Sequence, residues 1–215
     1  MKSITLMIVL LVSVCAGAQA DPCFGGTVAS YIAGSSCDFL GLTISNLTYH
    51  SSASGGASAP TAASVGINPE IIAGRKGLLF SANWSAGPGE AEDSQIGFTV
   101  TCALCTIVDL DLILAGNAQS SGSAGFMGTS TSPIVNLTAS NSSLETLATF
   151  SPVISIGLVE HIQVSGGTAT DGSAEISTAA SGFSTVSTIP EPRLGLMCLG
   201  VLLISLFRRS AKLHG

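Results

Sequence analysis

The sequence predicts an all-β protein, a single β-sandwich or jelly-roll-like domain with an N-terminal signal helix and a C-terminal transmembrane helix. Three observations support this prediction. Short segments of alternating apolar and polar residues recur along the 215-residue chain, separated by Gly- and Ser-rich turns. No stretch between the two ends shows a sustained helical period. An uncharged apolar run lies near each end of the chain. Many short strands with Gly-rich turns are typical of sandwiches and barrels.

The strands of the central domain, residues 21–187, follow from local alternation. We expect strands at residues 39–49, 77–84, 133–138, 144–150, 153–164, 174–178 and 183–186. The segment 153–164 is apolar on both faces, which predicts a central position in a sheet. Residues 51–66 and 117–132 are rich in Ser, Gly and Ala, and we expect long connections there. Gly87-Pro88-Gly89 predicts a turn.

The strongest strand signal runs over residues 95–116. Ile96, Phe98 and Val100 alternate with polar residues, and residues 106–114 alternate again. The sequence Cys102-Ala-Leu-Cys105 lies between the two halves, where the chain would turn. We therefore expect a hairpin that a disulfide staples at its turn.

The first 20 residues have the pattern of a secretory signal peptide. Lys2 gives a positive start, residues 4–14 form an apolar run, and Ala18-Gln19-Ala20 has the small-x-small pattern of a cleavage site. The mature chain is therefore expected to begin at Asp21, outside the cytoplasm.

Six cysteines are distributed between the targeting segments and the domain. Cys15 lies in the signal peptide and Cys198 in the C-terminal apolar run. The remaining four, in the exported domain, are Cys23, Cys37, Cys102 and Cys105. An even count in an oxidising compartment predicts two disulfides. Three connectivities are possible, and we favour the local pairs Cys23–Cys37 and Cys102–Cys105. The spacing of the second pair also occurs in redox motifs, but a strand-like segment without a basic neighbour argues against that role.

The exported domain is strongly acidic. Between Asp21 and Ile189 there are twelve acidic and two basic residues, a net charge of −10 against −6 for the whole chain. Such a surface repels phosphates, which argues against nucleic-acid binding.

The C-terminal segment, residues 188–215, has three parts in order. Pro190-Glu191-Pro192 precedes an uncharged apolar run at residues 194–207, and Arg208 and Arg209 follow it. The run is shorter than the roughly 20 residues of a usual transmembrane helix. Flanking arginines that reach the two interfaces can extend it, and basic residues after the run favour a cytoplasmic C-terminus. We predict a transmembrane helix over residues 194–207.

These three parts resemble the PEP-CTERM sorting signal of bacterial surface proteins. The resemblance implies that a membrane-embedded exosortase processes the chain near Pro190-Glu191-Pro192. It also implies a link to exopolysaccharide or biofilm, because such systems co-occur with polysaccharide production. The partners expected from it are the processing enzyme, the membrane and extracellular polysaccharide.

The sequence gives little support for catalysis. A serine triad needs a histidine base, and the mature domain offers only His50 and His161. No G-x-S-x-G motif occurs. We therefore predict no catalytic residues and no cofactor, and an exported hydrolase is the least favoured alternative.

Two acidic groups suggest a binding alternative. The predicted turn is followed by Glu90, Glu92 and Asp93, whose hard oxygen ligands would suit calcium. No EF-hand or repeat pattern is present, however, and we predict no metal ligands. Asp109 and Asp111 form a second pair. The few aromatic residues, 5% of the chain, give little surface for stacking on sugars.

The sequence thus predicts a non-enzymatic exported surface or extracellular-matrix protein. It would be anchored in the membrane by its C-terminal helix before processing and would then reside at the cell surface or outside the cell. A carbohydrate- or calcium-binding β-sandwich module is the alternative.

Overall fold

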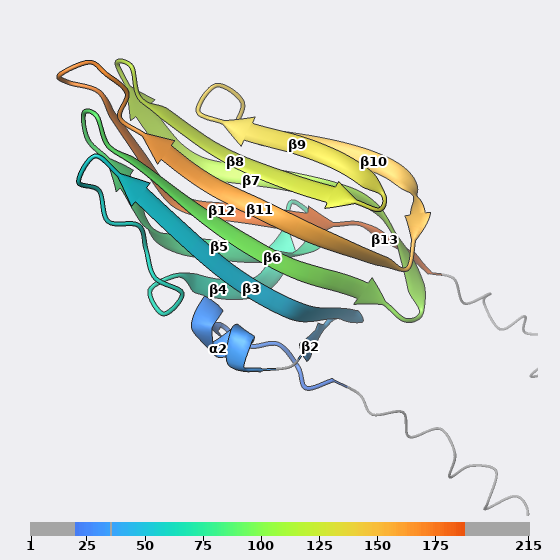
Figure 1. Cartoon of the computed structure of the whole chain (residues 1–215). Coiled ribbons are helices and arrows are strands. Elements are labelled where there is room, and N and C mark those ends of the chain that lie inside the picture. Colours follow the sequence, from blue (N-terminus) through green and yellow to red (C-terminus); the bar gives the residue numbers. More distant parts are fainter. Residues whose placement is uncertain (1–19, 35, 188–215) are drawn as a thin grey trace, which may run out of the picture.

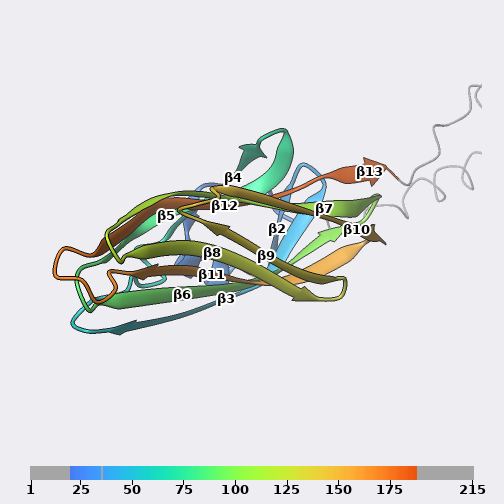
Figure 2. The same cartoon turned by 90° about the horizontal axis from the view of Figure 1, so that it is seen from above.

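The computed structural model describes residues 20–34 and 36–187. These residues form two antiparallel sheets stacked face to face, with one short helix beside them (Figures 1 and 2). The predicted all-β class and its sandwich arrangement are confirmed. The signal segment up to residue 19 and the tail 188–215 lie outside the described residues. Within the described part, no helix is both long and apolar enough to span a bilayer.

The first sheet has seven strands. In spatial order they are β1 (Gly26–Thr27), β4 (Gly66–Ile72), β5 (Arg75–Ala86), β12 (Ser173–Phe183), β7 (Cys105–Gln119) and β10 (Glu145–Val153), with β13 (Thr185–Ser187) paired to the start of β7. β12 is therefore an interior strand, bonded to β5 on one side and β7 on the other.

The second sheet has six strands. Their spatial order is β2 (Ser36–Phe39), β3 (Leu42–Ser54), β6 (Ala91–Cys102), β11 (Ser155–Ser165), β8 (Ser123–Thr131) and β9 (Ile134–Ser140). The strand predicted to be central at 153–164 is β11, which lies in the interior of the sheet between β6 and β8.

The core lies between the two sheets and follows directly from the alternation. In β6 every second residue from Glu92 to Cys102 is buried, while the residues between them face outward. The single tryptophan, Trp84, is fully buried, and its indole Nε1–H donates to Ser94 Oγ at 2.9 Å. Burying its large ring without losing that hydrogen bond stabilises the contact between β5 and β6.

Both long connections predicted from Ser- and Gly-rich composition are partly wrong. β3 continues to Ser54 and pairs with β6 as far as Ala91, so the first loop begins only at Gly55. The second segment contains the whole of β8, whose inward residues are Ala124, Phe126, Gly128 and Ser130. Because most of the inward side chains of β8 are small, the apolar alternation of its sequence is weak. Pairing with the neighbouring strands nevertheless stabilises the strand.

One short helix, α2 (Val28–Ala33), interrupts the β structure. Thr27 and Ser30 cap it reciprocally: the Ser30 amide donates to Thr27 Oγ1 at 3.3 Å, and the Thr27 amide donates to Ser30 Oγ at 3.0 Å. Six residues are too few to show a helical period, so the sequence pattern misses this element.

The predicted hairpin over residues 95–116 is wrong. β6 belongs to the six-stranded sheet and β7 to the seven-stranded sheet, so residues 102–105 cross from one sheet to the other. Alternation shows which face of a strand is buried but not which strand lies beside it. Two apolar faces joined by a short turn are compatible with pairing side by side or stacking face to face.

Both predicted disulfides are present. Cys23–Cys37 ties the N-terminal segment to β2, and Cys102–Cys105 closes the crossover between the sheets. Cys102 and Cys105 are both buried, so their sulfurs fill the edge of the core at this end. The second disulfide therefore holds the junction of two sheets, and not the tip of a hairpin.

The two disulfides should differ in their effect on stability. Cys23–Cys37 closes a loop with a sequence separation of 14, and Cys102–Cys105 one with a separation of 3. In the chain-entropy model we expect C23S/C37S to lower the free energy of unfolding by about 3 kcal/mol and C102S/C105S by about 2 kcal/mol. Urea unfolding of both variants beside the wild type measures this, and a larger loss for C102S/C105S would contradict the entropic account.

Candidate functional site

A groove of about 400 Å³ crosses the outer face of the six-stranded sheet. It lies at the end of β3 and β11 and the start of β6 and β8, opposite the end of the sandwich at which the described chain begins and stops (Figure 1). Concave sites of this size are the usual places for ligand binding.

Two neighbouring rows of small or polar residues form the floor of the groove. The strand register places Ser52, Asp93, Gln163, Gly125 and Ser140 in one row, and Ser54, Ala91, Ser165 and Ser123 in the next. From β3 to β9 the first row crosses four strand spacings, about 19 Å. The floor is therefore elongated and runs across the strands.

The residues that line the groove are mostly small, and several of them carry polar groups. The Asp93 carboxylate, the Gln163 amide and several serine hydroxyls can accept or donate hydrogen bonds to a hydroxylated ligand. Gly125 leaves the middle of the floor open, since a Cβ built there would meet only Ala139 O at 3.9 Å. The groove thus has room for an extended polar chain.

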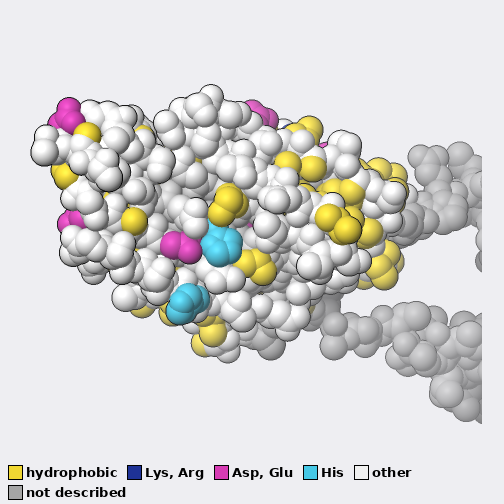
Figure 3. Space-filling model, turned by 45° about the horizontal axis from the view of Figure 1, so that its top comes forward, with side chains coloured by type: hydrophobic (Ala, Val, Ile, Leu, Met, Phe, Trp, Pro, Cys, Tyr) yellow, Lys and Arg dark blue, Asp and Glu magenta, His cyan; other side chains and the backbone are white. Residues whose placement is uncertain are grey.

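A histidine–carboxylate pair stands at the edge of the groove. His161 Nδ1 lies 3.3 Å from both carboxylate oxygens of Asp93, and both side chains are partly exposed. His50 lies in the same cross-strand row as His161, with Gln95 between them. Figure 3 shows two histidines and an acidic group together on this face, with no Lys or Arg visible around them.

The hydrogen-bond partners of the two histidines bear on whether either could act as a catalytic base. Among the described residues, no serine or threonine hydroxyl hydrogen bonds to His161 or His50, although Asp93 does orient the ring of His161. A nucleophilic mechanism needs a hydroxyl bonded to the second ring nitrogen. The pair can instead present an oriented imidazole N–H and a carboxylate to a ligand.

The three acidic residues considered as calcium ligands, Glu90, Glu92 and Asp93, do not form a cluster. The Glu90 carboxylate accepts from the Gly87 amide at 2.8 Å, and Glu92 points inward and accepts from the Ser85 amide at 3.2 Å. Asp93 points outward to His161. Burial raises the pKa of Glu92, partly offset by its backbone hydrogen bonds. In the part of the chain that the structure covers, no three acidic, His or Cys side chains are arranged to hold a metal ion.

The second acidic pair belongs to an ion cluster on the other sheet. Arg75 Nε lies 3.4 Å from Asp109 Oδ1, and Arg75 Nη1 lies 3.2 Å from Asp111 Oδ2. Gly182 lies under the arginine, because a Cβ there would come within 3.0 Å of Arg75 Cβ. Burial raises the pKa of Asp111, and the Arg75 charge opposes that rise. One arginine therefore offsets part of the charge of two buried carboxyl groups, and both carboxyl groups are held by it.

A second hollow, of about 230 Å³, lies between the N-terminal segment and β3. The Tyr31 hydroxyl donates to the Phe24 carbonyl at 2.8 Å, and burial raises the pKa of Tyr31 to about 12. Mostly apolar groups line this hollow beside the Cys23–Cys37 disulfide. We interpret it as a gap in the packing around α2.

The sequence interpretation missed the most unusual carboxyl of the domain. Glu160 lies in β11 among the inward residues Leu158 and Ile162 and is fully buried between the sheets. Neither carboxyl oxygen has a hydrogen-bond partner within the described residues. Burial raises its pKa to about 8, and the Ser181 hydroxyl on the facing strand β12, which lies close without reaching hydrogen-bond geometry, opposes that rise. Glu160 shares the alternation of Leu158 and Ile162, and this pattern could have predicted that its side chain faces the core.

The residues predicted to form the sorting signal lie outside the described residues. Pro190, Glu191, Pro192, Arg208 and Arg209 all belong to the segment 188–215, which the structure does not describe. The four disulfide cysteines lie away from the groove.

Comparisons with known proteins add no assignment. No protein-family profile matches the chain, and no curated protein matches it. The enzymatically active domain of bacteriophage CBA120 tailspike protein 4 aligns with 65% of this chain at 14% identity and a TM-score of 0.25, over 19% of its own length. A family 11 carbohydrate-binding module from Clostridium thermocellum, in complex with a β-1,3-1,4-mixed-linked tetrasaccharide, aligns over 74% of this chain and 96% of its own, at 6% identity and a TM-score of 0.17. TM-scores this low carry no argument about this chain.

Glu160 should make the stability of the domain depend on pH. Its folded-state pKa of about 8 lies above the ordinary value of 4.5, so the folded state holds the proton more tightly. The stabilisation is complete below pH 4.5 and is lost as pH rises toward 8. We expect E160Q to remove this fall and to be more stable than the wild type at pH 8.5 by roughly 2–4 kcal/mol.

Urea unfolding between pH 4.5 and pH 9 measures this dependence. E175Q is the matched control, because Glu175 is exposed on β12. An identical pH slope in the wild type, E160Q and E175Q would contradict the assignment of the dependence to Glu160.

Proposed function

We propose that this chain is a non-enzymatic exported surface or extracellular-matrix protein that is sorted through its C-terminal PEP-CTERM signal and displays a polysaccharide-binding groove. One observation carries the proposal: the described chain begins and stops at one end of the sandwich, and the groove lies at the other (Figure 1). A domain tethered by its tail at one end would hold the groove away from the membrane.

The cysteine chemistry supports export. Both disulfides lie within the described domain, and disulfides persist in oxidising compartments outside the cytoplasm. The signal segment 1–20 and the tail 188–215 supply the targeting signals at the two ends of the sequence. An exosortase-type membrane enzyme is the processing partner that the tail implies.

Polysaccharide is the ligand class that best suits the groove. The floor is elongated, open and lined by hydroxyl, amide and carboxylate groups, which match the hydroxyls of a sugar chain. Calcium is the less favoured ligand, because Glu90, Glu92 and Asp93 each hydrogen bond to a different part of the domain.

The charge of the domain narrows the class of polysaccharide. Asp93 places its carboxylate on the floor of the groove, and no basic residue lines the groove. The exported part also carries a net charge of −10. Acidic polysaccharides would be repelled by this field. We therefore infer a neutral or amino-sugar polymer as the ligand.

Processing of the tail can be tested by mass spectrometry of the protein from its native host. We expect the mature chain to begin at Asp21 and to lack residues 194–215, because cleavage near Pro190-Glu191-Pro192 removes the apolar run. In a host without an exosortase the same chain should stay membrane-bound with its tail intact. An intact tail on the mature protein in the native host would refute the processing step.

Groove binding can be tested by filling the floor. Gly125→Leu places a side chain in the middle of the groove, where the backbone leaves room for it. We expect at least about a tenfold loss of affinity for neutral polysaccharide, equivalent to about 1.4 kcal/mol. Affinity electrophoresis in gels containing a neutral glucan or an acidic polyuronate measures the loss and the charge preference.

Gly157→Leu is the matched control for this experiment. Gly157 lies on the same face of β11, outside the groove, and a Cβ there would meet nothing within 4 Å. Its affinity should equal that of the wild type. Equal loss in both variants, or no retention of the wild type by any polysaccharide, would contradict the groove assignment.

A further inference from the structure

An exposed apolar surface covers the end of the sandwich opposite the groove. Four residues form it. Three come from connections: Leu40 between β2 and β3, Leu104 in the β6–β7 crossover and Ile154 between β10 and β11. The fourth, Val186, lies in the strand β13. Their exposed fractions are 58%, 65%, 65% and 55%. Figure 3 shows hydrophobic side chains gathered at this end of the domain. We call these four residues the apolar tip.

The strand pairings bring the tip residues together. Leu42, two residues after Leu40, pairs with Cys102, and the Cys102 amide donates to the Ile154 carbonyl at 2.8 Å. Ser187, next to Val186, pairs with Cys105. The three connections and β13 thus meet near the Cys102–Cys105 disulfide.

Leu40 adopts a backbone conformation that its side chain disfavours. Leu40 and Gly41 form a two-residue turn with φ values of 53° and 85°. Asn, Asp or Gly usually occupies such positions, and a bulky residue with positive φ is uncommon. An exposed leucine gains nothing there from packing, so its presence points to a contact outside the domain.

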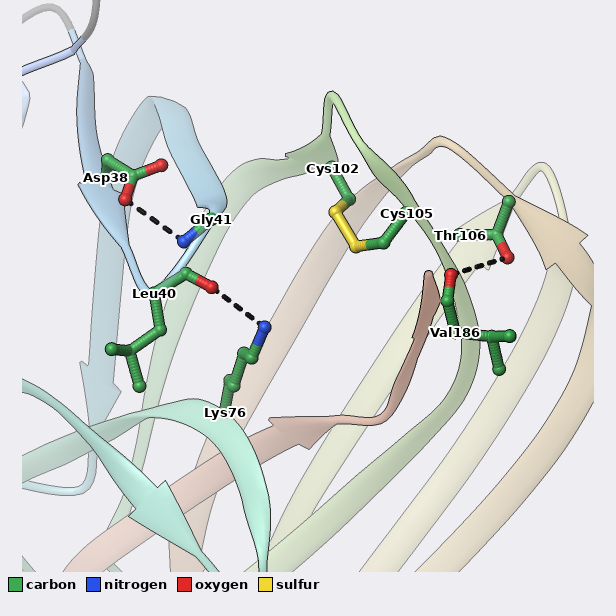
Figure 4. The surroundings of a disulfide bond; sticks show 8 residues. All are labelled: Asp38, Leu40, Gly41, Lys76, Cys102, Cys105, Thr106 and Val186. Carbon is green, nitrogen blue, oxygen red and sulfur yellow. Dashed lines mark hydrogen bonds between the residues drawn. A yellow bond between two sulfur atoms is a disulfide. The ribbon is translucent and has the colours of Figure 1, made fainter. Parts of the chain in front are cut away.

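A hollow of about 350 Å³ opens at the tip between Leu40 and Leu104. Lys76, one of only two basic residues in the exported part, lies against it and donates from Nζ to the Leu40 carbonyl at 2.8 Å. Figure 4 shows the Lys76 side chain rising from β5 toward the Leu40 turn, near the Cys102–Cys105 disulfide. The tip therefore combines apolar side chains with a cation, as membrane-interface surfaces do.

We propose that the apolar tip rests in the interface of a lipid bilayer while the segment 194–207 is inserted in that bilayer. The proposal rests on the tail insertion put forward above. The last described residue, Ser187, is adjacent to Val186 of the tip, and six residues separate it from Leu194. Six residues span at most about 20 Å when fully extended, so the tether keeps the tip near the bilayer.

The physical chemistry of the tip favours lipid as its partner. Exposed apolar patches mark surfaces that are covered in function, and the nearest surface on this tether is the membrane. The Lys76 ammonium would attract anionic headgroups. Asp38 lies nearby on β2, where its Oδ1 accepts from the Gly41 amide at 3.1 Å and is held in the turn. The acidic groove end would face away from the bilayer.

Tryptophan quenching tests the proposal on the exported chain with its tail intact. The chain is reconstituted into phosphatidylethanolamine and phosphatidylglycerol vesicles, with or without brominated acyl chains. We expect brominated lipid to lower the emission of Leu104→Trp and Val186→Trp about twofold, because interfacial side chains reach the acyl boundary. Trp84 is fully buried in the core, so the wild type supplies the background.

Leu147→Trp is the matched control. Leu147 is also an exposed leucine, but it lies on β10 opposite Asp111, four residues along β7 from the partner of Val153, which is about 13 Å from the tip end of the strand. Its emission should not change with brominated lipid. Equal quenching at all three positions would overturn the proposal, because the domain would then lie on its side.

Flotation of the vesicles separates this proposal from the tail insertion. If the chain floats with the vesicles while Leu104→Trp and Val186→Trp remain unquenched, the tail is inserted and the tip proposal is wrong. If the chain does not float, tail insertion fails and the tip proposal fails with it.

Discussion

The stacking of two sheets, each with one apolar face, is the constraint on which the rest of this domain depends. The strict alternation in β6 buries one set of side chains and leaves the other set on the outer face. The outer set is free of packing demands, and the groove is built from it. The crossover at residues 102–105 lets consecutive strands contribute to opposite sheets, and its disulfide lies where the two sheets join.

The sequence allowed the fold class, most strands and both disulfides to be predicted, because these depend on local alternation and on closely spaced cysteines. It did not allow strand neighbours to be predicted, as β6 and β7 show, because alternation carries no information on pairing. β8 was missed because its inward residues are mostly small. The groove joins Ser52, Asp93 and Ser140 from three separate strands, so only the register reveals it.

The charged residues illustrate how environment decides the role of a side chain. Adjacent residues Glu92 and Asp93 face opposite sides of one sheet, so proximity in sequence does not make them a site. Asp109 and Asp111 share a face, and both form ion pairs with Arg75, which lies across Gly182. Glu160 has no such partner in the described domain, and burial keeps its proton bound near neutral pH.

The groove and the last described residue, Ser187, lie at opposite ends of the sandwich, and this placement determines how the domain would transmit force. A pull between a polymer in the groove and an anchored tail would act along the strands. The short β13 has only three residues paired to β7. Once those pairs separate, the force would act on β12, the strand that precedes β13 in the chain. β12 is bonded to β5 and β7 along its length. Its hydrogen bonds would therefore be loaded together in shear, which resists extension far better than separation of bonds one at a time.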